Sequence, residues 1–207
     1  MIGVSVRSNV GAVLAEFRAL KAGIKDKATE RALNRAMDSA ATETKKQIRK
    51  VYNVRLAAIS RALKKKPAHG KQAVQVATLR VRGTRFGLIE FSATAIKPWN
   101  VKGKKRRMGG GVSVRIKKSG GRKLIKHAFI ATTGTGYRGV FIRLSKAPPG
   151  YRLKGGGQAY KDPIVNLRSI SVPAAFMHDA VIAAVQQAAR DSFVKNFQQQ
   201  VKYLQGK

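Results

Sequence analysis

The distribution of charge constrains this chain more than any other feature of its sequence. Lys and Arg number 43 against 9 Asp and Glu, so the formal net charge is +34 and the isoelectric point is about 11.5. From Thr44 to Lys161 there are 31 basic residues and a single acidic one, Glu90. Self-repulsion at this charge disfavours a compact isolated chain. We therefore expect a strongly negative partner, with nucleic acid as the first candidate and an acidic protein surface as the second.

The apolar content is nevertheless sufficient for a folded core. Val, Ile, Leu and Phe together make up 52 of the 207 residues. This share lies above the level at which a high net charge indicates a disordered chain. The absence of cysteine excludes disulfides, thiolate zinc sites and cysteine nucleophiles. The N-terminus lacks the pattern of a signal peptide, and no stretch approaches the roughly 18 apolar residues that span a bilayer. We expect a soluble protein with no membrane partner.

Apolar residues at helical spacing predict the helices. They recur over 9–24, over a second helix that Asp26 would cap and whose apolar stripe, from Ala32 to Val51, is rich in alanine, and over 56–63, where Lys64–Lys66 and a proline would end the helix. Near the other end of the chain, Ser171 is a suitable N-cap for a long last helix, and Pro173 suits its first turn. The apolar stripe of that helix is expected to comprise Phe176, Ala180, Ala184, Ala188, Val194, Phe197, Val201 and Leu204.

The middle of the chain alternates apolar and polar residues, as half-buried strands do. Gly83–Arg85 would join the first two strands as a hairpin, and Gly134–Gly136 would join the last two. In the strand between these hairpins, Ser113 is expected to point outward. The expected strands are 73–81, 86–91, 111–117, 127–132 and 137–144.

These elements predict an α+β fold, in which an antiparallel sheet of about four to six strands packs against N-terminal helices and a long C-terminal helix. We expect a single domain over 1–207, with helices in 1–66, a basic sheet in 71–170 and the last helix in 171–205. Two glycine-rich interruptions, 97–111 and 147–157, are expected to be mobile loops, and the first of them forms a basic arm.

Residues for catalysis or metal binding do not gather in this sequence. His69, His127 and His178 lack the spacing of metal ligands, and Gly109–Gly111 is not followed by the Lys-Ser or Lys-Thr of a phosphate-binding loop. Glu90 could act as a general base, but a lone carboxylate among cations is more often an ion-pair partner. We expect no enzyme activity, no metal and no cofactor.

The remaining signal is electrostatic. About a dozen cations within 25 residues favour contact with the backbone of a polyanion, without selection of bases. A solvated basic surface, or one paired with acids of a neighbouring protein, is the alternative. The candidate polyanion-binding residues are Lys102, Lys104, Lys105, Arg106, Arg107, Arg115, Lys117, Lys118, Arg122, Lys123 and Lys126.

The last helix also suggests a protein interface. At about 30 residues it would extend some 45 Å, which is more than a small sheet can cover. Part of its apolar stripe is therefore expected to contact a partner protein. The candidate interface residues are Phe193, Phe197, Val201 and Leu204.

The order of several short segments resembles the minor tail protein Z family of long-tailed bacteriophages and prophages, over about residues 28–205. Each segment is weak alone, and their order along the chain carries the resemblance. The segments are Arg31–Ala41, Tyr52–Leu63, the basic glycine-broken loop, His127–Ala131, Asp162–Leu167 and Ser171–Phe176.

This resemblance implies a noncatalytic tail-completion protein of the virion, assembled in the host cytoplasm. It would act at the head-proximal end of the tail, beside the tail-terminator ring, in head–tail joining and DNA delivery. The implied partners are the terminator and neighbouring neck and tail proteins, further copies in a sixfold ring, and genome DNA. The alternative is a free-standing, nonspecific nucleic-acid-binding protein, such as a nucleoid or ribosome-associated factor. An enzyme, the third reading, would lose its activity on replacement of Glu90.

Overall fold

A computed structural model describes residues 2–4, 22–70, 74–83, 85–97, 99–100, 107–108, 110–146 and 163–206. The fold is α+β, as predicted. The chain divides into two compact units, which are described separately. Unit 1 comprises Met1–Ile48, Ile59–Gly83 and Val172–Lys207, and unit 2 comprises Arg49–Ala58 and Thr84–Ser171. The single domain over 1–207 stays a prediction.

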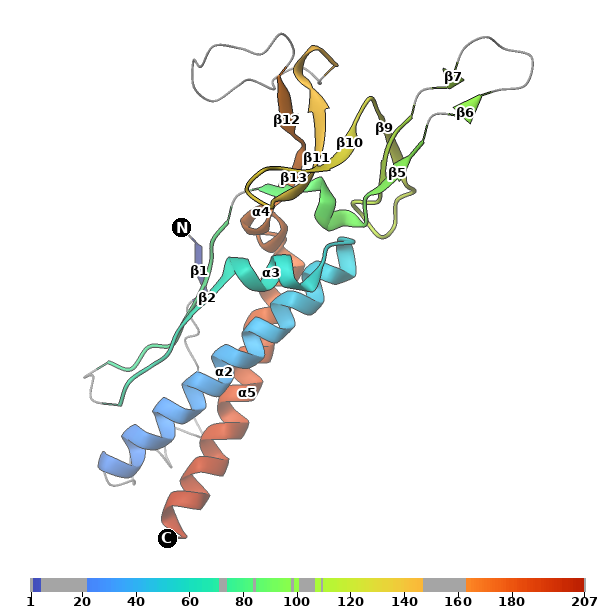
Figure 1. Ribbon diagram of the computed structural model, residues 1–207. Helices are drawn as coiled ribbons and strands as arrows, with labels where there is room; N and C mark the ends of the chain where they lie inside the picture. Colours follow the sequence, from blue (N-terminus) through green and yellow to red (C-terminus); the bar gives the residue numbers. More distant parts are fainter. Residues whose placement is uncertain are drawn as a thin grey trace. The chain divides into compact units, whose positions relative to one another are not determined.

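Two long helices form the centre of unit 1 and lie side by side (Figure 1). The α-helices among the described residues are α2 (Ala22–Val51), α3 (Leu56–Ala62), α4 (Val172–Phe176) and α5 (Asp179–Gln205). The predicted alanine-rich stripe of α2 is confirmed at Ala32, Ala36 and Ala40, which are buried, but its last member, Val51, is exposed. Ala32 and the neighbouring Ala28 are fully buried and pack with Phe197 and Val201 of α5. Small side chains on one helix thus make room for a ring on the other.

Polar side chains join the same two helices at intervals of four residues. The register shows that α2 and α5 are antiparallel, since residue numbers rise along one helix as they fall along the other. Gln200, only 7% exposed, receives one of these bonds, so its buried amide is partly satisfied. The three bonds are Arg31 Nη1 to Gln200 Oε1 (3.1 Å), Arg35 Nη1 to Asn196 Oδ1 (3.0 Å) and Ser39 Oγ to Ser192 Oγ (2.8 Å).

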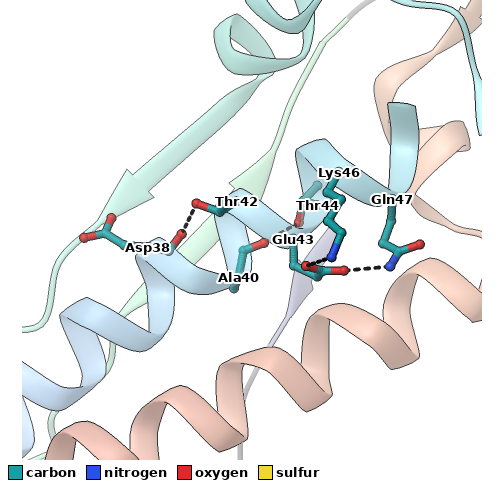
Figure 2. Close-up of polar contacts among 7 residues, drawn as sticks. All are labelled: Asp38, Ala40, Thr42, Glu43, Thr44, Lys46 and Gln47. Carbon is teal, nitrogen blue, oxygen red and sulfur yellow. Dashed lines mark hydrogen bonds and ion pairs between the residues drawn. The ribbon is translucent and has the colours of Figure 1, made fainter. Parts of the chain in front are cut away.

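Several other polar side chains of α2 are satisfied within the helix, as Figure 2 shows. The buried hydroxyl of Thr44 donates to the Ala40 carbonyl at 2.8 Å, one turn earlier. Glu43 accepts a bond from Gln47 Nε2 at 2.6 Å and lies 3.6 Å from Lys46 Nζ. Bonds between residues three or four apart support a helix locally.

Unit 1 also contains a three-stranded antiparallel sheet with the order β1-β3-β2. Its strands are β1 (Ile2–Val4), β2 (Leu63–Lys66) and β3 (Thr78–Val81). The prediction that Lys64–Lys66 end a helix is therefore wrong, because these residues lie in an edge strand with exposed side chains. Lysines on an edge strand are common because they discourage pairing with other chains.

Unit 2 consists mainly of small antiparallel sheets rather than one sheet of four to six strands. The sheets have the orders β5-β8-β9, β10-β11-β12, β13-β4 and β6-β7. Two short 3-10 helices, η1 (Leu88–Phe91) and η2 (Leu144–Lys146), accompany them. The strands are β4 (Arg85–Gly87), β5 (Thr94–Ile96), β6 (Trp99–Asn100), β7 (Arg107–Met108), β8 (Gly111–Val114), β9 (Lys123–Lys126), β10 (Phe129–Thr132), β11 (Arg138–Arg143), β12 (Ile164–Asn166) and β13 (Arg168–Ser171).

One of the two predicted hairpins is confirmed. Strands β10 and β11 pair around a turn in which Gly136 has φ 78, a conformation that glycine adopts without strain. The hairpin across Gly83–Arg85 is wrong, because β4 pairs with β13, about 80 residues later in the chain, and 88–91 is a 3-10 helix. Ser113 is buried at 8% exposure, since β8 is the central strand of its sheet.

The helix boundaries require three corrections. Asp26 lies inside α2, which already includes Ala22, so it is not an N-cap. The single last helix is two helices, α4 and α5, separated at Met177 and His178, with Pro173 in the first turn of α4 as predicted. The buried stripe in the first half of α5 lies one residue further along than predicted, on Val181, Val185 and Ala189 instead of Ala180, Ala184 and Ala188.

Some predicted elements lie outside the described residues. These are nearly all of the helix over 9–24, the loop over 147–157 and most of the arm over 97–111. At the base of the arm, Trp99 pairs with Met108 and Asn100 with Arg107, in the two-stranded ladder β6-β7.

Candidate polyanion-binding site

Unit 2 holds the larger share of the excess charge. It carries 23 Lys and Arg against two acidic residues, a formal charge of +21, whereas unit 1 carries 20 against seven, or +13. Apart from Arg107, the described cations of the predicted set lie in β9 and in the turn, residues 115–122, that joins β8 to β9. We call this segment, from Gly111 to Lys126, the cationic hairpin.

Arg122 holds the cationic hairpin together. Its Nε donates to Ser113 Oγ at 3.0 Å, and its Nη2 lies 2.9 Å from the Ser113 carbonyl. The same Nη2 lies 2.8 Å from the Ser92 carbonyl and 3.0 Å from Thr94 Oγ1. Ser92 has φ 52, in the left-handed region, at the end of η1. The planar guanidinium thus joins β5, β8 and the chain before β5, a task that suits arginine and not lysine.

Arg115 organises the turn itself. Its Nε donates to the Gly120 carbonyl at 3.0 Å, and its Nη2 bonds to the Lys118 carbonyl. We predicted both Arg115 and Arg122 as polyanion-binding residues, but the structure engages their guanidinium groups with main-chain oxygens. Their first role is therefore to shape the hairpin.

The four lysines of this segment have a different environment. Lys117, Lys118, Lys123 and Lys126 are exposed, and we call them the hairpin lysines. In the part of the chain that the structure describes, no carboxylate lies within ion-pair distance of them. An exposed ammonium group without an acidic neighbour can take a phosphate or carboxylate from another molecule.

The end of α2 adds further cations that the sequence analysis did not select. Main-chain bonds join residues 51–53 to the turn: Asn53 N–H donates to the Ile116 carbonyl at 2.8 Å, and Lys118 N–H donates to the Val51 carbonyl at 2.9 Å. The exposed side chains of Arg49, Lys50 and Arg55 belong to this same part of unit 2. The sequence feature that could have identified them is a group of basic residues in the last turn of a helix, next to the break at Asn53.

The remaining candidates belong to the basic arm. Lys102, Lys104, Lys105 and Arg106 lie outside the described residues. Arg107 lies in β7, where its main chain pairs with Asn100. Their contact with a polyanion stays a prediction.

The four predicted interface residues lie against the core of unit 1. Phe197 and Val201 are buried against α2, and Phe193 and Leu204 are partly buried against the same cluster. The rings of Phe193 and Phe197 stack with centroids 5.8 Å apart. Since α2 already covers Phe197 and Val201, their burial requires no partner, and an interface role for this set stays a prediction.

Groups for catalysis or metal binding do not converge among the described residues. No group of three His, Asp, Glu or Cys that could hold a metal occurs there. His69, His127 and His178 are all exposed, and His127, predicted in a strand, has φ 64 in a turn. The main-chain carbonyl of Glu90 accepts a bond from Arg55 N–H at 3.1 Å. The described helices also include none with the length and apolar character of a membrane span.

Comparison with known proteins agrees with the resemblance found in the sequence. The family described as prophage minor tail protein Z (GPZ) matches residues 11–205, nearly the whole chain. No curated protein and no solved structure shows a significant match. The chain therefore belongs to the prophage minor tail protein Z family, and is a structural protein of a phage tail that associates with other tail or neck proteins.

Proposed function

We propose that this chain is a noncatalytic tail-completion protein at the head-proximal end of the tail, where its cationic hairpin contacts a polyanion. The observation that supports this most strongly is the charge of unit 2, 23 basic residues against two acidic ones. Genome DNA enters or abuts that end of the tail, and it offers one negative charge for about every 1.7 Å of duplex.

The expected contact is with phosphates and not with base edges. The hairpin lysines are compact, mobile charges on flexible stems, which suit a point contact with a phosphate oxygen. The two arginines of the cationic hairpin, Arg115 and Arg122, are engaged in the fold and do not offer a bidentate contact to a base. Such a contact positions DNA without reading its sequence.

The net positive charge of the chain also affects the assembly of copies into a ring. In a ring that follows the tail, which we propose to be sixfold and to lie beside the tail terminator, chains of +34 would repel one another. A polyanion in the lumen, or acidic surfaces on the neighbours, would offset this repulsion. The ring should therefore be more stable in the assembled head-to-tail junction than in isolation.

A density map of the assembled head-to-tail junction tests this proposal. We expect the chain beside the terminator, with Lys117, Lys118, Lys123 and Lys126 directed at DNA or at acidic side chains. A chain located at the distal tip of the tail, or hairpin lysines that face only water, would contradict it. A free-standing nucleic-acid-binding role would instead be indicated if the purified chain bound duplex DNA tightly at 0.15 M salt and were absent from the particle.

A further inference from the structure

Two open sheet edges border one groove in unit 2. Strand β5 is at the edge of the β5-β8-β9 sheet, and β10 is at the edge of the β10-β11-β12 sheet. Within the described ranges, neither strand has a second ladder partner. The groove has a volume of about 530 Å³, within the range of pockets that bind ligands. Its lining residues are Ala93, Thr94, Ala95, Ile130, Ala131, Thr132 and Arg138.

The open edge of β10 presents main-chain groups to this groove. Thr133 N–H donates to the Tyr137 carbonyl at 2.9 Å, in the register of the β10–β11 ladder. Consecutive residues of an antiparallel strand direct their N–H and C=O groups to opposite sides. The ladder bonds therefore continue through Ala131, and the main-chain groups of Ile130 and Thr132 point away from β11.

The open edge of β5 follows by the same argument. His127 N–H donates to the Gly110 carbonyl at 3.3 Å, in the register of the β8–β9 ladder, so the even-numbered residues of β8 bond to β9. Odd-numbered residues such as Ser113 then bond to β5, where Ser113 pairs with Thr94. Thr94 bonds inward, and the N–H and C=O of Ala95 point outward.

The groove is chemically suited to an extended peptide. Its side chains are mostly Ala and Thr, which are short and leave the main chain accessible. A peptide strand supplies both donors and acceptors to such an edge, whereas a nucleic acid backbone offers only acceptors to the outward N–H groups and nothing to the outward carbonyls of Ala95 and Thr132.

The positive charge of the groove and of unit 2 favours an acidic peptide over a basic one. Among the described residues that line it, Arg138 alone is charged; its side chain is exposed and has no hydrogen bond or ion pair to any described residue. Unit 2 as a whole carries +21, so a basic segment would be repelled. A second copy of this chain, with 43 basic residues, is a poor source of an acidic strand.

We propose that this groove binds an extended, acidic segment of a neighbouring tail protein by strand addition. Main-chain hydrogen bonds along β5 or β10 supply the affinity, and Arg138 receives a carboxylate of the segment. This proposal does not require the chain to be at the head-proximal end, so its failure and that of the proposed function are distinguishable.

Residue-resolved hydrogen exchange tests the strand addition. The amides of Ala95, Ile130 and Thr132 should exchange freely in the isolated chain. In the assembled tail, those of the strand that binds the segment, Ala95 on β5 or Ile130 and Thr132 on β10, should exchange at least about tenfold more slowly. The amide of Ala131, already bonded to β11, is the internal control and should be protected in both states. Equal exchange of the three outward amides in the two states would overturn the proposal.

Two further measurements identify the occupant and the bonds that hold it. A photo-crosslinker at Thr132 in the assembled tail should join an acidic stretch of another tail protein. Cross-links to DNA alone, to a second copy of this chain or to nothing would overturn the proposal. Ala95→Pro, which removes one outward N–H, should reduce the cross-link yield at least severalfold, whereas Ala95→Val, which keeps it, should not. Equal yields would exclude bonding along β5 and leave β10 to be tested by the pair Ile130→Pro and Ile130→Val. Unchanged yields in both pairs would overturn strand addition.

The charge preference has its own matched pair of variants. Arg138→Ala should lower the yield of the same cross-link, whereas Lys146→Ala removes an equal charge from η2, outside the lining of the groove. An equal decrease in both variants would mean that overall charge, and not Arg138, attracts the segment. Circular dichroism and thermal unfolding of each variant establish that the chain still folds.

Discussion

The helix pair of unit 1 and the cationic hairpin of unit 2 use basic residues in different ways. Between α2 and α5, Arg31 and Arg35 donate to side-chain amides, and elsewhere in unit 1 Lys65 is paired with Asp38 at 2.6 Å. In the hairpin, Arg115 and Arg122 donate mainly to main-chain carbonyls. The hairpin lysines stay exposed.

This difference separates the charge that maintains the fold from the charge that is available to a partner. Arginine has a rigid fork of donors that several acceptors can share, so it contributes to structure even where carboxylates are scarce. Lysine has a single mobile charge and remains accessible. A composition of +34 therefore overstates the cations that a partner can reach, and the lysines of the hairpin are the best candidates among those described.

The largest expected effect of a single change is on the helix pair. Phe197→Ala should lower the free energy of unfolding by about 3–5 kcal/mol, because it leaves a cavity beside Ala28 and Ala32 that the α2 backbone cannot fill. Gln199→Ala, an exposed change on the same helix, should have an effect below about 0.5 kcal/mol. Denaturant titration of both variants measures this, and similar losses would refute the core role of Phe197.

A smaller loss is expected from the arginine that holds the hairpin. Arg122→Ala should cost about 1–2 kcal/mol, since it removes four hydrogen bonds at an exposed site. Arg122→Lys keeps the charge and should recover little of this loss. The neighbouring change Lys123→Ala removes the same charge and should be nearly neutral. If Arg122→Lys were as stable as wild type, charge and not geometry would explain the role of Arg122.

A still smaller effect is expected at the turn of the confirmed hairpin. Gly136→Ala should destabilise by about 1 kcal/mol, because φ 78 is unfavourable for a residue with a Cβ although the space around it is open. Gly134→Ala, in equally open space without that conformation, is the matched control and should be close to neutral. Equal thermal unfolding midpoints for the two variants would argue against the turn geometry.

Local patterns predicted the elements that local interactions determine. The alanine stripe of α2 and the turn at Gly136 were both visible in the sequence. The pairing of β4 with β13 was not, because no turn signal marks contact between Arg85 and Ser171. Nor could spacing show that the stripe of α5 begins at Val181, since Ala180 is equally compatible with helical periodicity.

The candidate site was predictable only in part, for a related reason. The sequence located the density of charge in the centre of the chain, but it treated all cations there alike. The bonds of Arg122 to Ser92 and Ser113 depend on tertiary geometry, as does the docking of 51–53 onto the turn. Those contacts distinguish structural arginines from exposed lysines.

The salt dependence of binding to duplex DNA tests the central claim most directly. Replacing Lys117, Lys118, Lys123 and Lys126 with alanine should reduce the slope of log K against log salt concentration by about 3–4, roughly 0.9 for each lost phosphate contact. The matched variant replaces four exposed lysines of unit 1, Lys27, Lys64, Lys66 and Lys195, and loses the same charge. Its slope should change by less than about one. Equal slopes in the two variants would show that the hairpin lysines have no special contact with the polyanion, and would contradict the account.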